Sequence, residues 1–130
     1  MPRKAGKAQT KAASATGSGV VPKRQWRSFL DAFSRDHHGW PVRLETHDRV
    51  TDERVVSGET PLESIDYDLE DESNPRINVV VRLDNKIVKH ILFLPSKMSF
   101  EPPDDLGEAV LHVTTVNTET AIHLRAPEQP

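Results

Sequence analysis

The clearest pattern of hydrophobic positions lies near the start of the chain. Trp26, Phe29, Leu30 and Phe33 recur at the spacing i, i+3, i+4 and i+7, which places them on one face of a helix. Gly39 follows shortly afterwards, where a glycine is suited to end a helix. A helix of about a dozen residues is unstable alone in water, so we expect its aromatic face to pack against the rest of the domain.

After residue 39 the spacing of the hydrophobic positions changes to two residues, which is the period of half-buried β-strands. The stretches that alternate in this way are 40–44, 65–69, 77–83, 109–115 and 120–124. Residues 87–94 are nearly all apolar, which predicts a central strand that is buried on both faces. We expect Asp84-Asn85 and Asn117-Thr118 to form two-residue hairpin turns.

Short strands at close spacing, without helices between them, indicate an antiparallel meander. The sequence therefore predicts an α+β fold with one N-terminal amphipathic helix packed on a curved antiparallel sheet of five to seven strands, which could roll into a partial barrel. We expect a single α+β domain over residues 25–126. A disordered basic tail is expected over residues 1–24, and a disordered C-terminus over residues 127–130.

The distribution of charge divides the chain at the same place. The first 24 residues carry six basic and no acidic side chains, whereas residues 25–130 carry 11 basic and 20 acidic ones. The six basic residues are Arg3, Lys4, Lys7, Lys11, Lys23 and Arg24. Because cations spaced along a flexible chain can follow a phosphate backbone, this tail is a candidate anchor for nucleic acid. The alternatives are a solubilising leader, a tail that lies on the acidic body of the same protein, and an organellar transit peptide.

The composition excludes several classes of chemistry. The chain has no cysteine, which excludes disulfides, thiol catalysis and cysteine-ligated zinc. No apolar stretch approaches the roughly 20 residues of a membrane-spanning helix, so we expect a soluble cytoplasmic protein with no membrane partner. Ser28, Ser34 and Ser57 lie in no signature of an activated nucleophile, and the glycines form no phosphate-binding loop, so we expect no cofactor.

Acidic residues gather on one of the predicted strands. Asp66 and Asp68 are two positions apart, so their side chains point to the same face about 7 Å from each other. Together with Glu70 they form a candidate site for Ca²⁺ or Mg²⁺, which prefer oxygen ligands. The stretch lacks the central glycine and flanking helices of a calcium-binding loop, so a solvated strand face is the alternative.

Two histidines form a second candidate site. If Asn117-Thr118 forms the hairpin turn, the register places His112 opposite His123 on the outer face of the sheet. Two imidazoles so close could bind a metal or respond to pH, but no third ligand is evident, and two exposed histidines are the alternative. His90 lies within the apolar stretch 87–94, where a lone histidine is usually a hydrogen-bonded core residue.

Several short motifs occur in a fixed order along the body of the chain. They are Trp26-x-x-Phe29, Gly39-Trp40, the strand from Pro61 to Asp68, His90-Ile91 running to Pro95, and Thr120-x-Ile122-x-Leu124. This arrangement resembles a small bacterial family of domains of unknown function, over about residues 25–126 and none of the basic tail. The resemblance implies a compact α+β domain in a bacterial cytoplasm. It implies no known catalytic or binding residues.

The fold signature is complete, and no catalytic constellation accompanies it. We therefore expect a non-enzymatic protein-binding or regulatory module. A nucleic-acid-associated protein, anchored non-specifically by the basic tail, is the first alternative. A small metal-dependent enzyme that uses Asp66 and Asp68, or His112 and His123, is the second.

Overall fold

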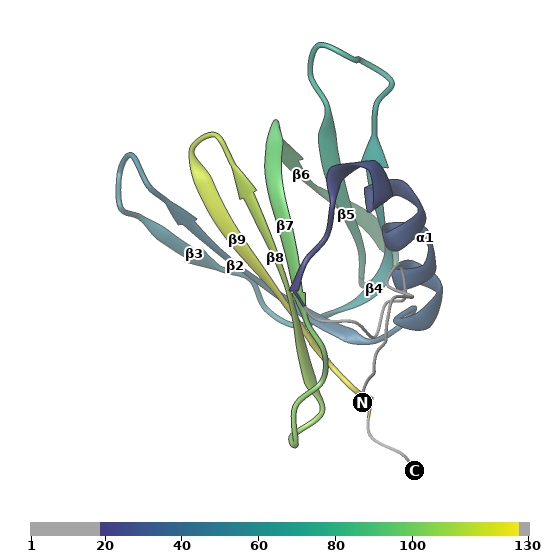
Figure 1. The fold of residues 1–130 in the computed structure, drawn as a ribbon. Helices are drawn as coiled ribbons and strands as arrows, with labels where there is room; N and C mark the ends of the chain where they lie inside the picture. Colours follow the sequence, from purple (N-terminus) through teal and green to yellow (C-terminus); the bar gives the residue numbers. More distant parts are fainter. Residues whose placement is uncertain (1–18, 128–130) are drawn as a thin grey trace, which may run out of the picture.

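A computed structural model describes residues 19–127 of the chain. In this part the elements are β1 (Gly19–Val20), η1 (Lys23–Gln25), α1 (Trp26–Asp36), β2 (Pro41–Asp48), β3 (Arg54–Val56), β4 (Thr60–Asp68), β5 (Arg76–Leu83), β6 (Lys86–Phe93), β7 (Pro95–Glu101), β8 (Glu108–Thr115) and β9 (Thr118–Arg125). Figure 1 shows the strands fanning out from a narrow base, with helix α1 on one side of the sheet. Neither helical segment of the described part is long and apolar enough to cross a membrane.

Helix α1 lies where the spacing of hydrophobic positions predicts it. Trp26, Phe29, Leu30 and Phe33 are at most 2% exposed and form its buried face. The rings of Phe29 and Phe33 lie against Phe100 of β7, with centroid distances of 5.9 and 5.3 Å. The aromatic face therefore packs into the core of the domain, as the short length of the helix requires.

The nine strands form one sheet with the order β1-β7-β8-β9-β2-β4-β5-β6, and β3 pairs with β2. Every pairing is antiparallel, so the α+β class is confirmed. The sheet is not closed, and it has more strands than the five to seven that the sequence predicts. β1 and β3 are too short to show a period of two, and β7 begins at a proline and directs only Met98 and Phe100 into the core.

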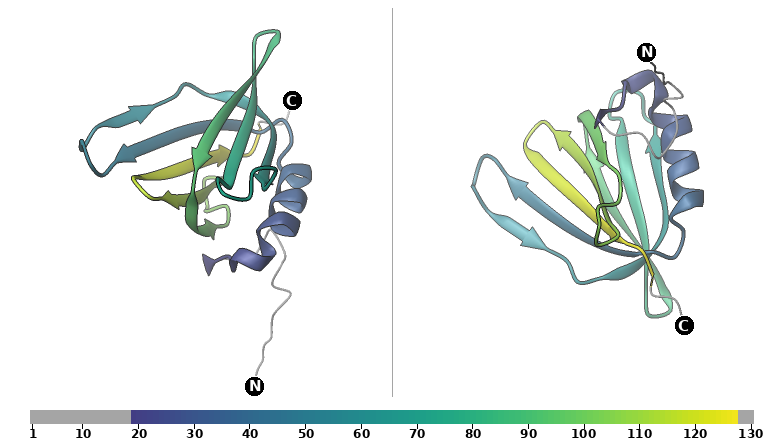
Figure 2. Two further views of the ribbon diagram at one scale, coloured as in Figure 1. Left: turned by 90° about the horizontal axis from the view of Figure 1, so that it is seen from above. Right: turned by 60° about the horizontal axis from the view of Figure 1, so that its bottom comes forward.

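The sheet bends sharply between β2 and β4. These two strands pair only through Pro41 with Pro61 and Val42 with Thr60. Beyond this contact they diverge, as the views in Figure 2 show. One layer therefore consists of β1, β7, β8, β9, β2 and β3, and the other of β4, β5 and β6. The chain crosses between the layers at Leu94, whose φ of 55° lies in the left-handed region that residues other than glycine rarely adopt.

Helix α1 covers the edge of β4 that the bend leaves without a strand partner. The Ser34 hydroxyl donates a hydrogen bond to the carbonyl of Ile65 at 2.9 Å and accepts one from its N–H at 2.8 Å. At the start of the same edge, Gly39 N–H donates to the Leu62 carbonyl and Leu62 N–H donates to the Trp40 carbonyl, at 2.8 and 2.9 Å. These bonds satisfy backbone groups that an edge strand otherwise exposes.

Strand β6 lies at one end of the sheet, so the prediction of a central strand buried on both faces is wrong. Among the described strands it pairs with β5 alone. Its inward row consists of Val88, His90 and Leu92. Its outward row consists of Ile87, Lys89, Ile91 and Phe93, all of which are exposed. Because both rows are largely apolar, the sequence of β6 has the pattern of a fully covered strand although one face is open.

One of the two predicted hairpin turns is confirmed. Asp84-Asn85 joins β5 to β6 as a two-residue turn. The predicted turn at Asn117-Thr118 is wrong by one residue, because Val116-Asn117 makes the turn and Thr118 already belongs to β9. The hydroxyl of Thr115 accepts the N–H of Thr118 at 3.0 Å and so fixes the turn at this position.

Candidate functional site

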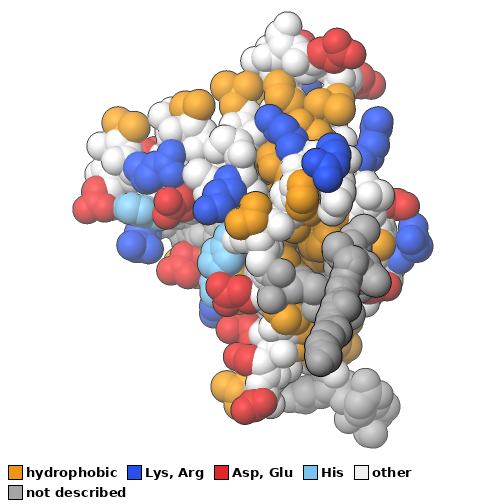
Figure 3. Space-filling view, viewed as in Figure 1, with side chains coloured by type: hydrophobic (Ala, Val, Ile, Leu, Met, Phe, Trp, Pro, Cys, Tyr) orange, Lys and Arg blue, Asp and Glu red, His pale blue; other side chains and the backbone are white. Residues whose placement is uncertain are grey.

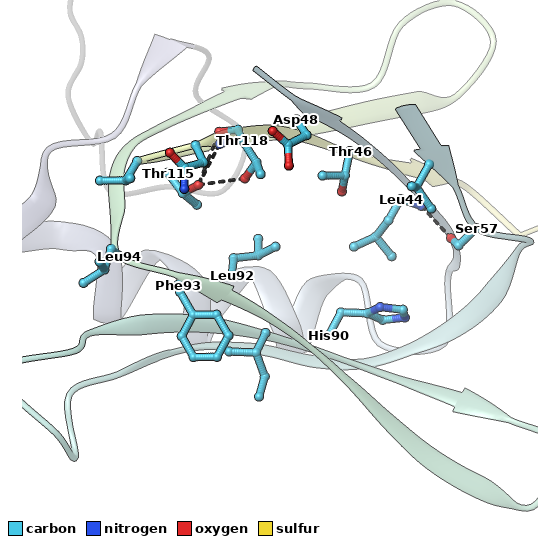
Figure 4. A pocket seen from close by; sticks show the side chains of 14 residues that line it. Leu44, Thr46, Asp48, Ser57, His90, Leu92, Phe93, Leu94, Thr115 and Thr118 are labelled. Atoms are coloured by element: carbon cyan, nitrogen blue, oxygen red, sulfur yellow. Dashed lines mark hydrogen bonds between the residues drawn. The ribbon is translucent and has the colours of Figure 1, made fainter. Parts of the chain in front are cut away.

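A groove opens between the two layers of the sheet, on the side away from the contact between β2 and β4. Its volume is about 460 Å³, which is within the range of ligand-binding clefts. One wall is formed by β2, β3 and the residue Ser57 that follows β3, the other by residues 90–94, and the turn at residues 115–118 closes one end (Figure 4). We call this cleft the β6 groove.

Two neighbouring strands become polar as they approach the groove. In paired order, the inward row of β2 is Val42, Leu44, Thr46 and Asp48, and that of β9 is Leu124, Ile122, Thr120 and Thr118. Both rows are aliphatic where the layers meet and carry hydroxyl or carboxylate groups where the layers diverge. The hydrophobic core therefore ends in a polar rim at the β6 groove.

The hydroxyls of this rim bond to other groups of the protein. Thr46 Oγ1 lies 3.1 Å from Thr120 Oγ1, and Thr115 Oγ1 lies 2.7 Å from Thr118 Oγ1. Ser57 Oγ accepts a backbone N–H of β2 at 2.9 Å. Within the described part of the chain, none of these hydroxyls bonds to a histidine or carboxylate that would activate it as a nucleophile.

One carboxylate and one imidazole line the groove. Asp48 Oδ1 accepts the backbone N–H groups of Val50 and Thr51 at 2.9 and 3.2 Å, whereas Asp48 Oδ2 accepts no hydrogen bond from the residues that the structure describes. His90 is half-buried and extends from β6 toward the side of Leu44 (Figure 4). Its ring has no hydrogen-bond partner in residues 19–127. The prediction of a hydrogen-bonded core histidine is therefore wrong, because the layers diverge at this position.

The groove runs along the backbone edge of β6. All five residues from 90 to 94 line it, although successive side chains of a strand point to opposite faces. Hydrogen-bonded and non-hydrogen-bonded pairs alternate along an antiparallel ladder, and the residues that flank a two-residue turn form the first bonded pair. Here these residues are Leu83 and Lys86. Counting from them, the N–H and C=O groups of Ile91 and Phe93 point away from β5 and toward the open edge.

Exposed hydrophobic side chains stand around the groove. Val55, Phe93 and Val116 line it and are 66%, 56% and 63% exposed. Leu94, at the corner between β6 and β7, is also exposed. Figure 3 shows hydrophobic side chains gathered along the upper ends of the strands in the orientation of Figure 1. An apolar patch with a polar rim is typical of a surface that another molecule covers.

The two aspartates predicted to bind a cation lie on the outer face of β4, away from the groove. Asp66 Oδ2 and Asp68 Oδ2 both accept hydrogen bonds from Asn78 Nδ2, at 3.1 and 3.2 Å. The N–H of Glu70 and the amide of Asn78 lower the pKa of Asp68, and Arg76 Nε lies 3.7 Å from the same carboxylate. The pair therefore already has donors from the protein. No group of three or more histidines, aspartates or glutamates in the described part is placed to hold a metal ion.

His112 and His123 share an outer face of the sheet, but they do not lie opposite each other. Because the turn comes one residue earlier, His112 pairs with Ala121, and the predicted register is wrong by two residues. His112 Nε2 lies 3.0 Å from Glu101 Oε2, and His123 Nε2 lies 3.3 Å from Glu45 Oε1. Each imidazole therefore has a carboxylate of its own.

Residues 18–130 match a family model that is described as a family of unknown function, DUF5335. The chain belongs to this family. The resemblance that the sequence motifs suggest is thereby confirmed, and the match to DUF5335 begins earlier than residue 25. No curated protein and no solved structure matches the chain. Evidence for the function of this DUF5335 domain therefore comes from its own geometry.

Most of the basic tail lies outside the part of the chain that the structure describes. Four of its basic residues lie outside the described residues and outside the DUF5335 match, namely Arg3, Lys4, Lys7 and Lys11. Residues 128–130 also lie outside the described part. Lys23 and Arg24 belong to η1 and are exposed, and Lys23 Nζ lies 5.4 Å from the centroid of the Trp26 ring.

No motif in the sequence marks the residues of the β6 groove as a binding site, and His90 is predicted there as a core residue. The sequence does contain a signal for the groove. Thr46 and Asp48 follow Val42 and Leu44 at the inward positions of one alternating strand, so this row changes from aliphatic to polar. Polar residues at the inward positions of a strand indicate that the core ends there or opens to solvent. Which strands face each other across that opening depends on the order of the sheet.

Proposed function

We propose that this DUF5335 domain is a protein-binding module that adds an extended segment of a partner protein to the open edge of β6. The observation that carries the proposal is a largely apolar edge strand of eight residues that faces a groove. Strands of this kind pair readily with other chains, and native proteins usually cover or charge them. In strand addition, main-chain hydrogen bonds supply affinity and alternate side chains supply specificity.

The other edges of the sheet are covered or short. Helix α1 and the Ser34 hydroxyl cover β4. β1 pairs with β7 at Ser99 and Phe100. Val21, the residue that follows β1, donates its N–H to the Met98 carbonyl at 2.9 Å. β3 has three residues. Among the described strands, β6 alone combines length, apolar side chains and an open backbone edge.

The groove has room for a single extended segment. A strand that pairs with β6 would direct alternate side chains toward Leu44 and Leu92, which face the space between the layers (Figure 4). The wall formed by β2 and β3 stands beside the same edge, which favours one added strand over the edge of a second folded sheet. The rim hydroxyls already have protein partners, so the unmet hydrogen-bonding capacity of the groove lies in the backbone edge of β6, in Asp48 Oδ2 and in the ring of His90.

The backbone edge can be tested without removing any bond of the β5–β6 ladder. Ile91→Pro removes an N–H that points away from β5, and proline is tolerated at such edge positions. Ile91→Ala is the matched control, because it shortens the same side chain and keeps the N–H. Random peptides of about a dozen residues, displayed on phage, are selected for binding to the native full chain. Thermal unfolding checks that both variants are folded.

We expect the selected peptides to alternate apolar and polar residues. They should bind the Ile91→Ala variant nearly as well as the native chain, and the Ile91→Pro variant about tenfold more weakly, since a main-chain bond is lost and the proline ring obstructs the edge. Bound peptide should also slow hydrogen exchange at the amides of Ile91 and Phe93. Equal binding to the two variants, or no enrichment at all, contradicts the proposal.

A second candidate function is non-specific association with nucleic acid. It is favoured by Lys23, Arg24 and Arg27, which are exposed and form no ion pair within the described part of the chain. Lys23 and Arg24 end the basic run of the tail, and Arg27 continues it in helix α1. If the six basic residues of the tail neutralise phosphates, the logarithm of the affinity for duplex DNA should fall with the logarithm of salt with a slope of about −5. Replacing Lys23 and Arg24 by glutamine should lower the magnitude of the slope by about 2. An unchanged slope would count against this function.

A further inference from the structure

The polar rim of the β6 groove restricts which segment can be added there. We infer that the partner segment carries a lysine or arginine on its inward face, between apolar inward residues, and that this cation pairs with Asp48. The inference rests on the proposed strand addition. It concerns the side chains of the partner, whereas the proposed function concerns its backbone.

Asp48 has the free capacity that such a pair requires. Its Oδ1 holds the turn after β2, and its Oδ2 has no hydrogen-bond partner among the described residues. No lysine or arginine lines the groove. The neighbouring Arg49 is engaged elsewhere, since its guanidinium donates to the carbonyls of Thr115 and Val116 at 2.8 and 2.9 Å. A carboxylate between low-dielectric walls attracts a cation more strongly than one on an open surface.

The surroundings of Asp48 determine the residues that flank the cation. In Figure 4, Leu44 and His90 lie toward one end of the groove, Leu94 and Thr115 lie toward the other, and Asp48 lies between them. Inward side chains of an extended segment recur about every 7 Å. The inward neighbours of the cation therefore face Leu44 on one side and Leu94 on the other, so apolar side chains fit these positions.

The charge of the folded body favours the same class of partner. Residues 25–130 carry 11 basic and 20 acidic side chains. An excess of acidic groups attracts a basic segment over a distance and raises its rate of association at low salt. This attraction acts on any cation, so the test must separate it from the specific pair with Asp48.

Three synthetic nine-residue peptides with blocked ends are the probes. Valine and threonine alternate in each, with valine at the inward positions, and the central inward residue is lysine, glutamine or glutamate. Because the pattern is symmetric, the same residue types occupy the same positions whether the peptide pairs parallel or antiparallel to β6. Binding to the native full chain and to Asp48→Asn is measured by calorimetry at pH 8, where histidine is ordinarily neutral. The asparagine oxygen can still accept the N–H groups of the turn, so the variant keeps the turn while it removes the charge and replaces the acceptor Oδ2 with an amide donor.

We expect the lysine peptide to bind the native chain about fivefold more tightly than the glutamine peptide, which is the upper end for an ion pair at a partly exposed position. The glutamate peptide should bind most weakly, and the preference for lysine should disappear in Asp48→Asn. Equal binding of all three peptides overturns the inference and leaves strand addition intact. A lysine preference that persists in Asp48→Asn also overturns it, because the acidic body then explains the preference. If none of the peptides binds, strand addition itself fails.

Discussion

The contact between Ser34 and Ile65 allows a direct test of how the protein protects an unpaired sheet edge. Ser34→Ala removes the acceptor of the Ile65 N–H and the donor to the Ile65 carbonyl, at 2.8 and 2.9 Å. Ile65 is 1% exposed, so water reaches these groups poorly. A buried backbone group without a partner costs about 1–3 kcal/mol, and alanine regains about 0.5 kcal/mol of helix propensity. We expect the free energy of unfolding to fall by about 2–3 kcal/mol.

Urea unfolding followed by circular dichroism measures this loss. Ser28→Ala is the control on the same helix, because the Ser28 hydroxyl donates to the Gln25 carbonyl at 3.2 Å in an exposed position. That change should alter the free energy of unfolding by less than about 0.5 kcal/mol. The amide of Ile65 should also exchange faster in Ser34→Ala. If both variants lose equally little stability, apolar packing alone holds the helix on β4, and the assigned role of the hydroxyl is refuted.

Three further changes test other parts of the description. Burial lowers the pKa of His37 below its ordinary value of 6.5, so the native state binds fewer protons than the unfolded state. The protein should therefore lose stability as the pH falls below about 6.5. His37→Gln should reduce this pH dependence of the free energy of unfolding between about pH 7 and 5. Leu94→Gly should raise the free energy of unfolding by up to about 1 kcal/mol, because glycine adopts the φ of 55° without strain. Millimolar Ca²⁺ or Mg²⁺ should leave the melting temperature unchanged, since Asp66 and Asp68 already share the amide of Asn78. A clear rise in the melting temperature would instead support a cation site at these aspartates.

Local patterns predict the parts of this fold that local interactions determine. The helical spacing from Trp26 to Phe33 is unambiguous, and every member of the stripe is buried. The turn at Asp84-Asn85 is likewise predictable from its residue types and the alternating runs on either side. These features depend on neighbours within a few positions along the chain.

The misplaced turn between β8 and β9 shows where local patterns stop being sufficient. Asn117-Thr118 and Val116-Asn117 are both acceptable two-residue turns, and the choice between them moves the partner of His112 by two residues. The hydroxyl of Thr115, which bonds to Thr118, accompanies the second choice. For this reason the predicted pairing of His112 with His123 is wrong, although the prediction that both side chains share one face of the sheet is correct.

The role of β6 depends on the order of the whole sheet, which no local pattern contains. An apolar row on each face predicts a strand that is covered on both sides, but in the isolated chain only Leu92 of the inward row is buried, and Val88 and His90 are half-buried. Ile87, Ile91 and Phe93 of the outward row are 53%, 37% and 56% exposed. Local sequence usually agrees with the final environment of a residue, and disagreement concentrates at functional sites. The mismatch between the sequence of β6 and its open outward face therefore supports the proposal that a partner protein binds at this strand.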